Sequence, residues 1–173
     1  MEDLLVLVDL EDHPIGPEGK WKVHQQGLLH RAFSVFLLQG NQMLIQKRAE
    51  HKYHSAGLWA NTCCSHPRVG ESLDLAVERR LLEETAIQCP VHPLFSFHYR
   101  AVFENGLIEY ELDHVYVGLY SGTFQANPEE ASQMKWITFE ELESELTQHP
   151  EQFAPWFIIA APQVMKYQKR LTH

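Results

Sequence analysis

Residues 72–87 decide the fold class, and they read Ser72-Leu73-Asp74-Leu75-Ala76-Val77-Glu78-Arg79-Arg80-Leu81-Leu82-Glu83-Glu84-Thr85-Ala86-Ile87. The apolar positions follow a helical spacing and form one stripe, at Leu73, Ala76, Val77 and Leu81. Ser72 is a favoured helix N-cap, and Asp74 places a negative charge in the first turn, where the helix dipole favours it. We therefore predict an amphipathic helix over this segment, with its apolar stripe packed against a sheet.

Strand patterns flank this helix on both sides. Residues 33–38 and 43–47 enclose the turn Gln39-Gly40-Asn41-Gln42, an arrangement typical of a β-hairpin. Residues 95–103 and 107–120 have the pattern of two long strands, joined at Glu104-Asn105-Gly106 by an Asn-Gly turn. The middle of the chain is therefore predicted to be mostly β-sheet.

The two ends of the chain add shorter elements. The apolar run 4–10 predicts a strand, and the Pro- and Gly-rich segment 12–17 predicts a turn after it. Near the C-terminus we expect a short strand and a short helix, at residues 134–137 and 139–146. Pro155 can open a terminal helix, which Pro162 should kink or interrupt. Strands outnumber helices, which predicts an α/β or α+β sandwich with helices covering a sheet.

The composition is that of one ordinary globular domain spanning residues 1–173. With 45% hydrophobic and 21% charged residues, the chain can bury a core without disulfide or metal staples. Its formal net charge of −9 argues against a general nucleic-acid binder. No window approaches the ~18 apolar residues of a membrane span, and the N-terminus lacks the basic start of a signal peptide. Three cysteines, two of them adjacent, do not suggest a secreted disulfide framework, so we predict a cytoplasmic, reduced protein.

Three acids share one face of the predicted strand 107–120, because side chains alternate along a strand. They are Glu109, Glu111 and Asp113, and apolar residues continue the same face beyond them. If this face is buried throughout, the carboxylates must be protonated, paired or bound to a cation. Alternatively, the strand begins in solvent and the acids are hydrated, which the spacing alone slightly favours.

The stretch Asn61-Thr62-Cys63-Cys64-Ser65-His66-Pro67 places a thiol two residues from an imidazole, just before the acidic helix. Histidines also precede the first hairpin, at His24 and His30. Imidazoles and carboxylates together suit a divalent ion such as Zn, Mn or Mg. The plainer alternatives are that each histidine is a structural residue and that each cysteine is a small buried hydrophobe.

The charges on the predicted helix form two i,i+4 pairs, Arg79–Glu83 and Arg80–Glu84. As exposed salt bridges they would contribute only a few tenths of a kcal/mol. Together with Glu71, however, they have the outline of a Nudix box, a loop–helix motif that binds metal-diphosphate. Three positions depart from its pattern: Ser65 and Ala86 stand where the box has glycines, and Arg80 stands where it has a glutamate.

The chain resembles type 1 isopentenyl-diphosphate delta-isomerases, a divergent branch of the Nudix superfamily. The resemblance covers nearly the whole length and includes the segments 57–67, 108–111 and 153–157. Its most specific element is Trp-x-Asn-(Ser/Thr)-x-Cys-x-His-Pro, because ordinary Nudix hydrolases have no matching cysteine. The resemblance implies an α/β/α sandwich with a mixed, largely antiparallel sheet flanked by helices.

The resemblance also implies a site. The metal ligands would be His24, His30, His66, Glu109 and Glu111, with Glu84 beside a second magnesium bound with the diphosphate. The catalytic residues would be Cys64, Glu111 and Tyr99. The substrate contacts would be Lys20, Arg48, Lys52, Arg80 and Trp156, of which the cations grip the diphosphate.

The implied reaction interconverts isopentenyl diphosphate and dimethylallyl diphosphate in isoprenoid biosynthesis. It moves a double bond by adding a proton at one carbon and removing one from another. Glu111, hydrogen-bonded to Tyr99, would serve one face of the substrate and Cys64 the other, with delivery to the alkene assigned to the Glu111 side. The ring face of Trp156 would stabilise the developing cation by ~2 kcal/mol or more. The implied partner is this small molecule, with no nucleic acid or membrane, and the chain would be a monomer or weak homodimer.

Two alternatives stand beside this interpretation. A Nudix pyrophosphohydrolase would need the box residues that Ser65, Arg80 and Ala86 replace. A catalytically silent binding module should have lost some of the proposed ligands, yet Cys64 and Glu111 are both present.

Overall fold

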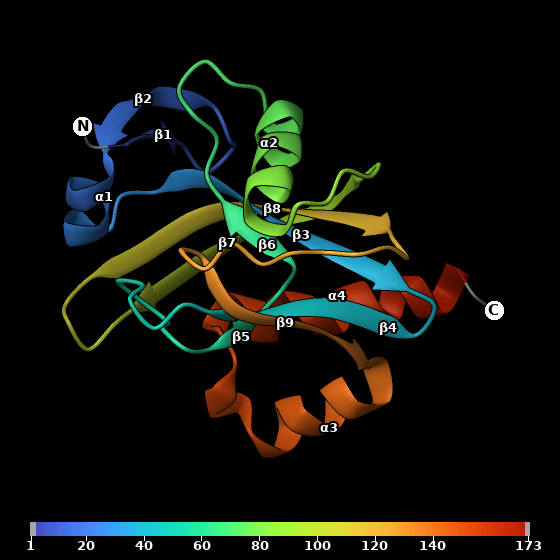
Figure 1. Ribbon diagram of the computed structural model, residues 1–173. Coiled ribbons are helices and arrows are strands. Elements are labelled where there is room, and N and C mark those ends of the chain that lie inside the picture. The colour runs from blue at the N-terminus through green and yellow to red at the C-terminus, as the bar shows by residue number, and fades with distance from the viewer. Residues whose placement is uncertain (1–2, 172–173) are drawn as a thin grey trace.

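A single sheet organises the computed structural model of the chain, which describes residues 3–171 (Figure 1). Its strands are β1 (Leu4–Val8), β2 (Pro14–Gly19), β3 (His30–Gln39), β4 (Gln42–Arg48), β5 (Trp59–Ala60), β6 (Cys63–Ser65), β7 (His92–Val102), β8 (Ile108–Leu119) and β9 (Ala131–Thr138). The helices are α1 (Lys20–Gln26), α2 (Leu73–Thr85), α3 (Phe139–Gln148) and α4 (Pro155–Leu171), with one 3-10 turn, η1 (Pro150–Gln152).

Strand β3 lies at the centre of the sheet. It pairs in parallel with β8 along residues 30–38 and 111–119, and antiparallel with β1, β4 and β6. The remaining ladders, β1–β2, β4–β5, β4–β9 and β7–β8, are antiparallel. The mixed, largely antiparallel sheet is therefore confirmed.

The two faces of β3 build two cores because its side chains alternate. Phe36 and Leu38 pack in a cluster with α4, in which the Phe36 and Phe157 rings stack at 5.9 Å. Val35 and Leu37 face the opposite way and join the apolar stripe of α2. Figure 1 shows α2 and α4 on opposite sides of the sheet, so the predicted α/β/α sandwich is confirmed.

The helix predicted at residues 72–87 is α2, and its start is as expected. The Ser72 hydroxyl accepts a hydrogen bond from the Leu75 amide at 3.3 Å, and the helix buries Ala76, Val77 and Leu81. Its end is less ordinary, because Ala86 takes the left-handed conformation with φ 59°. Glycine is the usual residue in this position, and Ala86 is the residue that departs from the last glycine of the Nudix box.

The β-hairpins are confirmed, whereas the N-terminal turn is not. Residues 14–17, expected to form a turn, lie in strand β2, which pairs with β1 alone. An edge strand tolerates proline because the missing amide would point away from the ladder. The pattern also gave no sign of the short helix α1 or of the short strands β5 and β6.

The expected interruption of the terminal helix at Pro162 is wrong, because α4 runs from Pro155 to Leu171. Proline removes one backbone hydrogen bond and costs ~3 kcal/mol inside a helix. Phe157, Ala160, Ala161 and Val164 are all fully buried in this helix, so its packing on the sheet outweighs the cost. Within residues 3–171, the helices are too short or too polar to span a membrane.

Gly27 allows the end of α1 to pack closely against β8, next to the site described below. It ends α1 with φ 66°, and a Cβ atom there would lie 2.9 Å from a side-chain carbon of Ile108. Glycine meets both demands, the left-handed backbone and the close approach. The two histidines on either side, His24 and His30, are thereby held next to the start of β8, where Glu109 and Glu111 stand.

Candidate active site and metal centre

A cavity of about 480 Å³ opens between α1, the β4–β5 loop and the strands β3, β6 and β8. Nine of the predicted site residues line it: Lys20, Arg48, Lys52, Cys64, His66, Arg80, Glu109, Glu111 and Trp156. The lysines and arginines of this set therefore line the same cavity as Cys64 and the two glutamates. These residues are spread from position 20 to position 156 of the sequence, and the fold brings them to one cavity, which the sequence spacing alone could not establish.

The three predicted histidines converge although they come from different elements. His24 lies in α1, His30 begins β3 and His66 follows β6. The ring centres of His30 and His66 are 5.0 Å apart, and that of His24 is 5.4 Å from His30 and 6.4 Å from His66. Such a cluster is compatible with one shared cation.

Backbone carbonyls fix which nitrogen of two of these rings is available. His24 Nδ1 lies 2.8 Å from the Lys20 carbonyl oxygen, and His30 Nδ1 lies 3.0 Å from that of Leu28. A carbonyl oxygen only accepts, so each Nδ1 carries a proton, and each Nε2 faces the cluster. Burial lowers the pKa of His24 to about 4 and that of His66 to about 3. Both rings are therefore neutral near pH 7, as metal ligands must be.

The acids of β8 are buried, so the alternative of hydrated carboxylates is wrong. Glu109 is 2% exposed and Glu111 is 7% exposed. Glu111 Oε2 lies 3.0 Å from His66 Nε2 and 3.4 Å from His30 Nε2. Burial raises the pKa of Glu111, but the contacts with His30 and His66 outweigh it and bring the pKa well below its usual range. Glu111 is therefore ionised in a site from which water is largely excluded.

The third acid of this face, Asp113, has a different state. It is 1% exposed, and burial followed by the charge of Glu111 raises its pKa well above the usual value. The Ser34 hydroxyl donates to Asp113 Oδ2 at 2.8 Å. The surroundings of Asp113 therefore favour the neutral carboxyl form, and this residue belongs to the packing beneath the site.

The donor atoms around Glu109 and Glu111 fit a divalent cation. Two groups have ligand atoms within 4.8 Å of one another, His24–His54–Glu109 and His30–His66–Glu111. His30 Nε2 and Glu109 Oε1 are buried without a hydrogen-bond partner. A buried polar atom left without a partner is costly, and coordination of a cation would satisfy both atoms.

His54 is a member of this cluster that the sequence did not reveal. Its Nε2 lies 2.6 Å from Glu109 Oε2, and its side chain is 4% exposed. It stands in the loop after β4, two residues beyond Lys52. The signal that could have found it is this proximity to a predicted substrate contact, in a segment with a second histidine and a tyrosine.

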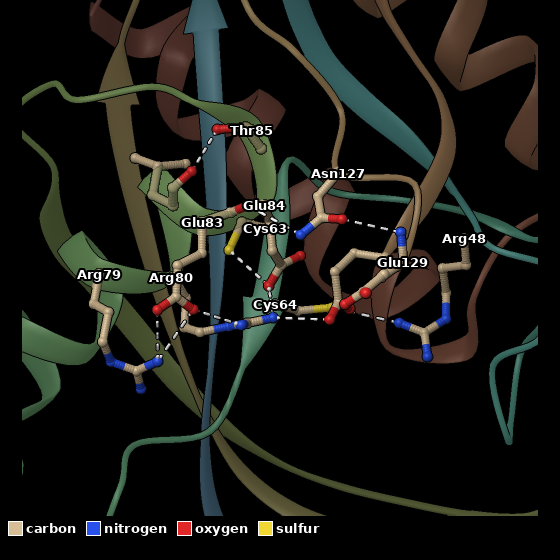
Figure 2. Close-up of polar contacts among 12 residues, drawn as sticks. Arg48, Cys63, Cys64, Arg79, Arg80, Glu83, Glu84, Thr85, Asn127 and Glu129 are labelled. Atoms are coloured by element: carbon tan, nitrogen blue, oxygen red, sulfur yellow. Dashed lines mark hydrogen bonds and ion pairs between the residues drawn. The ribbon is translucent and has the colours of Figure 1, made fainter.

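The two adjacent cysteines face opposite ways from β6 (Figure 2). Cys64 Sγ lies 3.8 Å from an Arg48 guanidinium nitrogen, on the cavity side. Loss of water contact raises the pKa of Cys64, against the opposing effect of Arg48, so the thiol keeps its proton at pH 7. Cys63 is fully buried and donates to Glu84 at 3.4 Å. It was expected to be a buried hydrophobe, and it is buried, with one polar contact in addition.

The cationic end of the cavity is already occupied by carboxylates. Arg80 contacts Glu84 at 3.0 Å and Glu83 at 2.7 Å, as Figure 2 shows, and it reaches Glu130 at 3.1 Å. Lys52 binds the same Glu130 at 2.8 Å. Glu130, which the sequence did not single out, therefore bridges two of the predicted diphosphate contacts. Glu84 lies with this cationic group and not in either His/Glu group.

The aromatic residues differ from expectation in one contact. Tyr99 pairs with Glu111 across the β7–β8 ladder, but its buried hydroxyl has no hydrogen-bond partner, so the expected bond to Glu111 is not formed. Trp156 donates its indole N–H to Asn61 Oδ1 at 3.0 Å, and the Arg48 guanidinium lies 5.1 Å from its ring centre. Asn61, in the segment before Cys64, therefore fixes the orientation of the tryptophan.

Glu71 links the loop before α2 to the helix, and its replacement should lower the free energy of unfolding by an amount that depends on pH. Its two oxygens receive two Arg79 nitrogens at 2.8 and 2.9 Å, and this pairing lowers the pKa of Glu71 from 4.5 to about 2. A folded-state pKa below the unfolded one gives a stabilisation that is complete above the unfolded pKa and is lost as the pH falls toward the folded pKa. We expect Glu71→Gln to lower the free energy of unfolding by about 1 kcal/mol at pH 7.

Urea unfolding of both proteins between pH 7 and pH 3 checks this prediction. The difference between wild type and variant should narrow as the pH falls from 4.5 toward 2, since the wild-type carboxylate then also becomes protonated. A difference that stays constant over this range would contradict the assigned ion pair.

Comparisons with known proteins agree with the fold. Residues 28–157 match the family model of the NUDIX domain, so the chain is a member of the Nudix superfamily. Solved structures show the same fold at low identity. A protein of Deinococcus radiodurans superimposes with a TM-score of 0.68, at 20% identity over 85% of this chain and 90% of that one. A MutT protein of Methanosarcina mazei Go1 gives 0.61, at 17% identity over 83% and 95%.

Sequence relatives narrow the class. The chain is 49% identical over 159 residues to the isopentenyl-diphosphate delta-isomerase of Serratia proteamaculans, which covers 91% of this chain and 89% of that protein. It is 44% identical over 166 residues to isopentenyl-diphosphate delta-isomerase 2 of Aromatoleum aromaticum, covering 95% and 88%. The chain belongs to the isopentenyl-diphosphate delta-isomerase family, in its Nudix branch.

Proposed function

We propose that this chain interconverts isopentenyl diphosphate and dimethylallyl diphosphate by adding and removing protons at the two ends of an allylic unit. The observation that supports this most directly is one cavity lined by Cys64, by the buried Glu111 and by four cationic side chains. Hydrolysis at a Nudix site needs no thiol, and a module that only binds its ligand needs no buried, ionised acid in the same cavity.

The diphosphate is held at the cationic end. Lys20, Arg48, Lys52 and Arg80 line the cavity, and guanidinium groups bind phosphate oxygens well. To bind a diphosphate, Arg80 would exchange part of its carboxylate contacts for phosphate oxygens. Burial, followed by the charge of Lys52, lowers the pKa of Lys20, so an anionic ligand would relieve the repulsion between these cations. A magnesium ion that arrives with the diphosphate would meet Glu84, whose carboxylate stands beside Arg80.

The hydrocarbon end lies against Trp156 and the histidine cluster. His24, His30, His66, Glu109 and Glu111 would hold a divalent cation, for which Mn, Zn and Mg are all chemically reasonable. When bound, such a cation supplies the fixed positive charge that orients Glu111. Tyr99 and Trp156, whose rings meet edge to face at 6.2 Å, help to keep water from the carbocation that develops during the reaction.

Each turnover adds one proton to the substrate and removes another from it. In the forward direction Glu111 gives a proton to the terminal alkene carbon, and Cys64 as thiolate takes one from C2. Return of dimethylallyl diphosphate reverses both transfers. The pKa shifts favour a protonated Cys64 and an ionised Glu111, which in this scheme is the state that ends the forward reaction and begins the reverse one.

Proton NMR of the purified protein with isopentenyl diphosphate and magnesium in deuterated water tests the proposal. We expect dimethylallyl diphosphate to appear with deuterium incorporated, because each protonation draws on a group that exchanges with solvent. Release of phosphate would instead support a Nudix hydrolase and overturn the role given to Arg80. Binding without any turnover, even with manganese or zinc added, would support the silent module.

The wider setting belongs to the same proposal. We take residues 1–173 as a single isomerase domain that works as a monomer or weak homodimer on a small-molecule substrate. Cytoplasmic action agrees with three free cysteines, because Cys64 must stay reduced to exchange protons.

A further inference from the structure

We propose that His54 is a positioning residue of the metal centre, holding one oxygen of Glu109 so that the other faces the cation. This inference rests on the proposed function, since it takes Glu109 as a ligand. It adds a residue that neither the motifs nor the family resemblance assigns.

The contact between the two side chains is short and buried. His54 Nε2 lies 2.6 Å from Glu109 Oε2, and the two side chains are 4% and 2% exposed. The other oxygen, Oε1, has no hydrogen-bond partner. The carboxylate is therefore divided between a held oxygen and a free one, and the free oxygen would be available to a cation.

The nitrogens of His54 separate it from the ligand histidines. In His24 and His30 a backbone carbonyl holds the Nδ1 proton, which leaves Nε2 for a cation. In His54 the buried Nδ1 has no partner. A buried N–H without a partner costs more than a buried lone pair left unused, so the proton of His54 belongs on Nε2, facing Glu109. A protonated Nε2 positions a ligand and does not bind the metal.

Three aromatic rings pack against the imidazole of His54. Phe103 stacks on it at 4.9 Å with an interplanar angle of 11°, and Tyr53 meets it edge to face at 4.4 Å. Trp156 also meets it edge to face, at 6.0 Å. A ring fixed in this way can impose its orientation on the carboxylate it contacts.

The backbone of the same residue connects this contact to the diphosphate end. Arg48 donates to the His54 carbonyl oxygen at 3.2 Å, with its guanidinium also beside Cys64. The loop that places His54 over Glu109 is thus held by a proposed substrate contact. Groups that orient metal ligands in this manner typically change metal affinity by about 10- to 100-fold when they are removed.

Manganese binding by the purified, metal-free protein tests the inference, followed by the EPR signal of free Mn²⁺. His54→Phe keeps the ring stack and removes the N–H, and His54→Leu serves if the Phe variant does not fold. We expect either to raise the Mn²⁺ dissociation constant by about 10- to 100-fold. His54→Gln retains an N–H donor and should stay within a few-fold of wild type. His51→Gln is the matched control, because His51 lies in the same loop, exposed and facing Glu129.

The outcomes separate this inference from the proposed function. If wild type binds Mn²⁺ and the Phe or Leu variant binds it equally well, His54 does not position Glu109. If Gln loses as much affinity as Phe, the imidazole acts by packing or by binding the ion itself, which also overturns the inference. If wild type binds no Mn²⁺, Zn²⁺ or Mg²⁺, the metal centre itself is wrong. Circular dichroism and urea unfolding of the metal-free variants establish that each comparison is made on folded protein.

Discussion

Cys64→Ala is expected to lower kcat for isomerisation by about 10³-fold or more while the protein stays folded. The thiol lies on the cavity wall beside Arg48, and we propose it as the proton-exchanging group on its side of the substrate. Alanine removes it without disturbing the strand β6, because a small side chain still fits there. The rate of dimethylallyl diphosphate formation by NMR gives kcat, and circular dichroism checks the fold.

Cys63→Ala is the control for this variant. Cys63 points toward Glu84, away from the cavity, so its loss should reduce kcat only mildly. Equal losses at Cys63 and Cys64 would mean that the wrong thiol is assigned, or that the pair serves the fold alone.

Glu111→Gln should have an effect of the same size, a loss of about 10³-fold or more in kcat. The amide has the shape of the carboxylate but cannot carry the proton through the cycle. It also removes the negative charge that faces His30 and His66 at 3.4 and 3.0 Å, so Mn²⁺ affinity should fall as well. The same NMR assay and the EPR titration measure the two effects.

Asp113→Asn is the matched control, two residues along the same face of β8. Burial and the charge of Glu111 raise the pKa of Asp113 and favour its neutral form, so an uncharged amide is a close substitute. We expect kcat to remain within a few-fold of wild type. Near-normal turnover in Glu111→Gln, or an equal collapse in Asp113→Asn, would refute the assignment of Glu111.

Local patterns predicted those parts of the fold in which local forces dominate. The cap at Ser72, the apolar stripe of α2 and the Asn-Gly turn at residues 104–106 all follow from neighbouring residues. Strand β2 was missed because an edge strand tolerates proline, and the uninterrupted α4 was missed because its packing on the sheet outweighs the cost of Pro162. Short strands such as β6 have too few residues to show any period.

The site was predictable only in part. Glu109, Glu111 and Asp113 share a face by simple alternation, but their burial depends on the strands beside β8. The convergence of the histidines came from the family resemblance, since no local rule relates α1 to the end of β6. His54 and Glu130 were missed because their importance lies in contacts between distant parts of the chain, with Glu109 for His54 and with Lys52 and Arg80 for Glu130.

The parallel ladder between β3 and β8 sets the order in which this protein can assemble. It pairs His30 with Glu111, so a long loop must close before these two residues meet. We expect this pairing to form later than the hairpins between neighbouring strands, because its entropy cost precedes any reward. The ligand set would then be incomplete in a partly folded chain, and a cation that binds it would act after the folding barrier. We accordingly expect metal to slow unfolding and to leave the folding rate nearly unchanged.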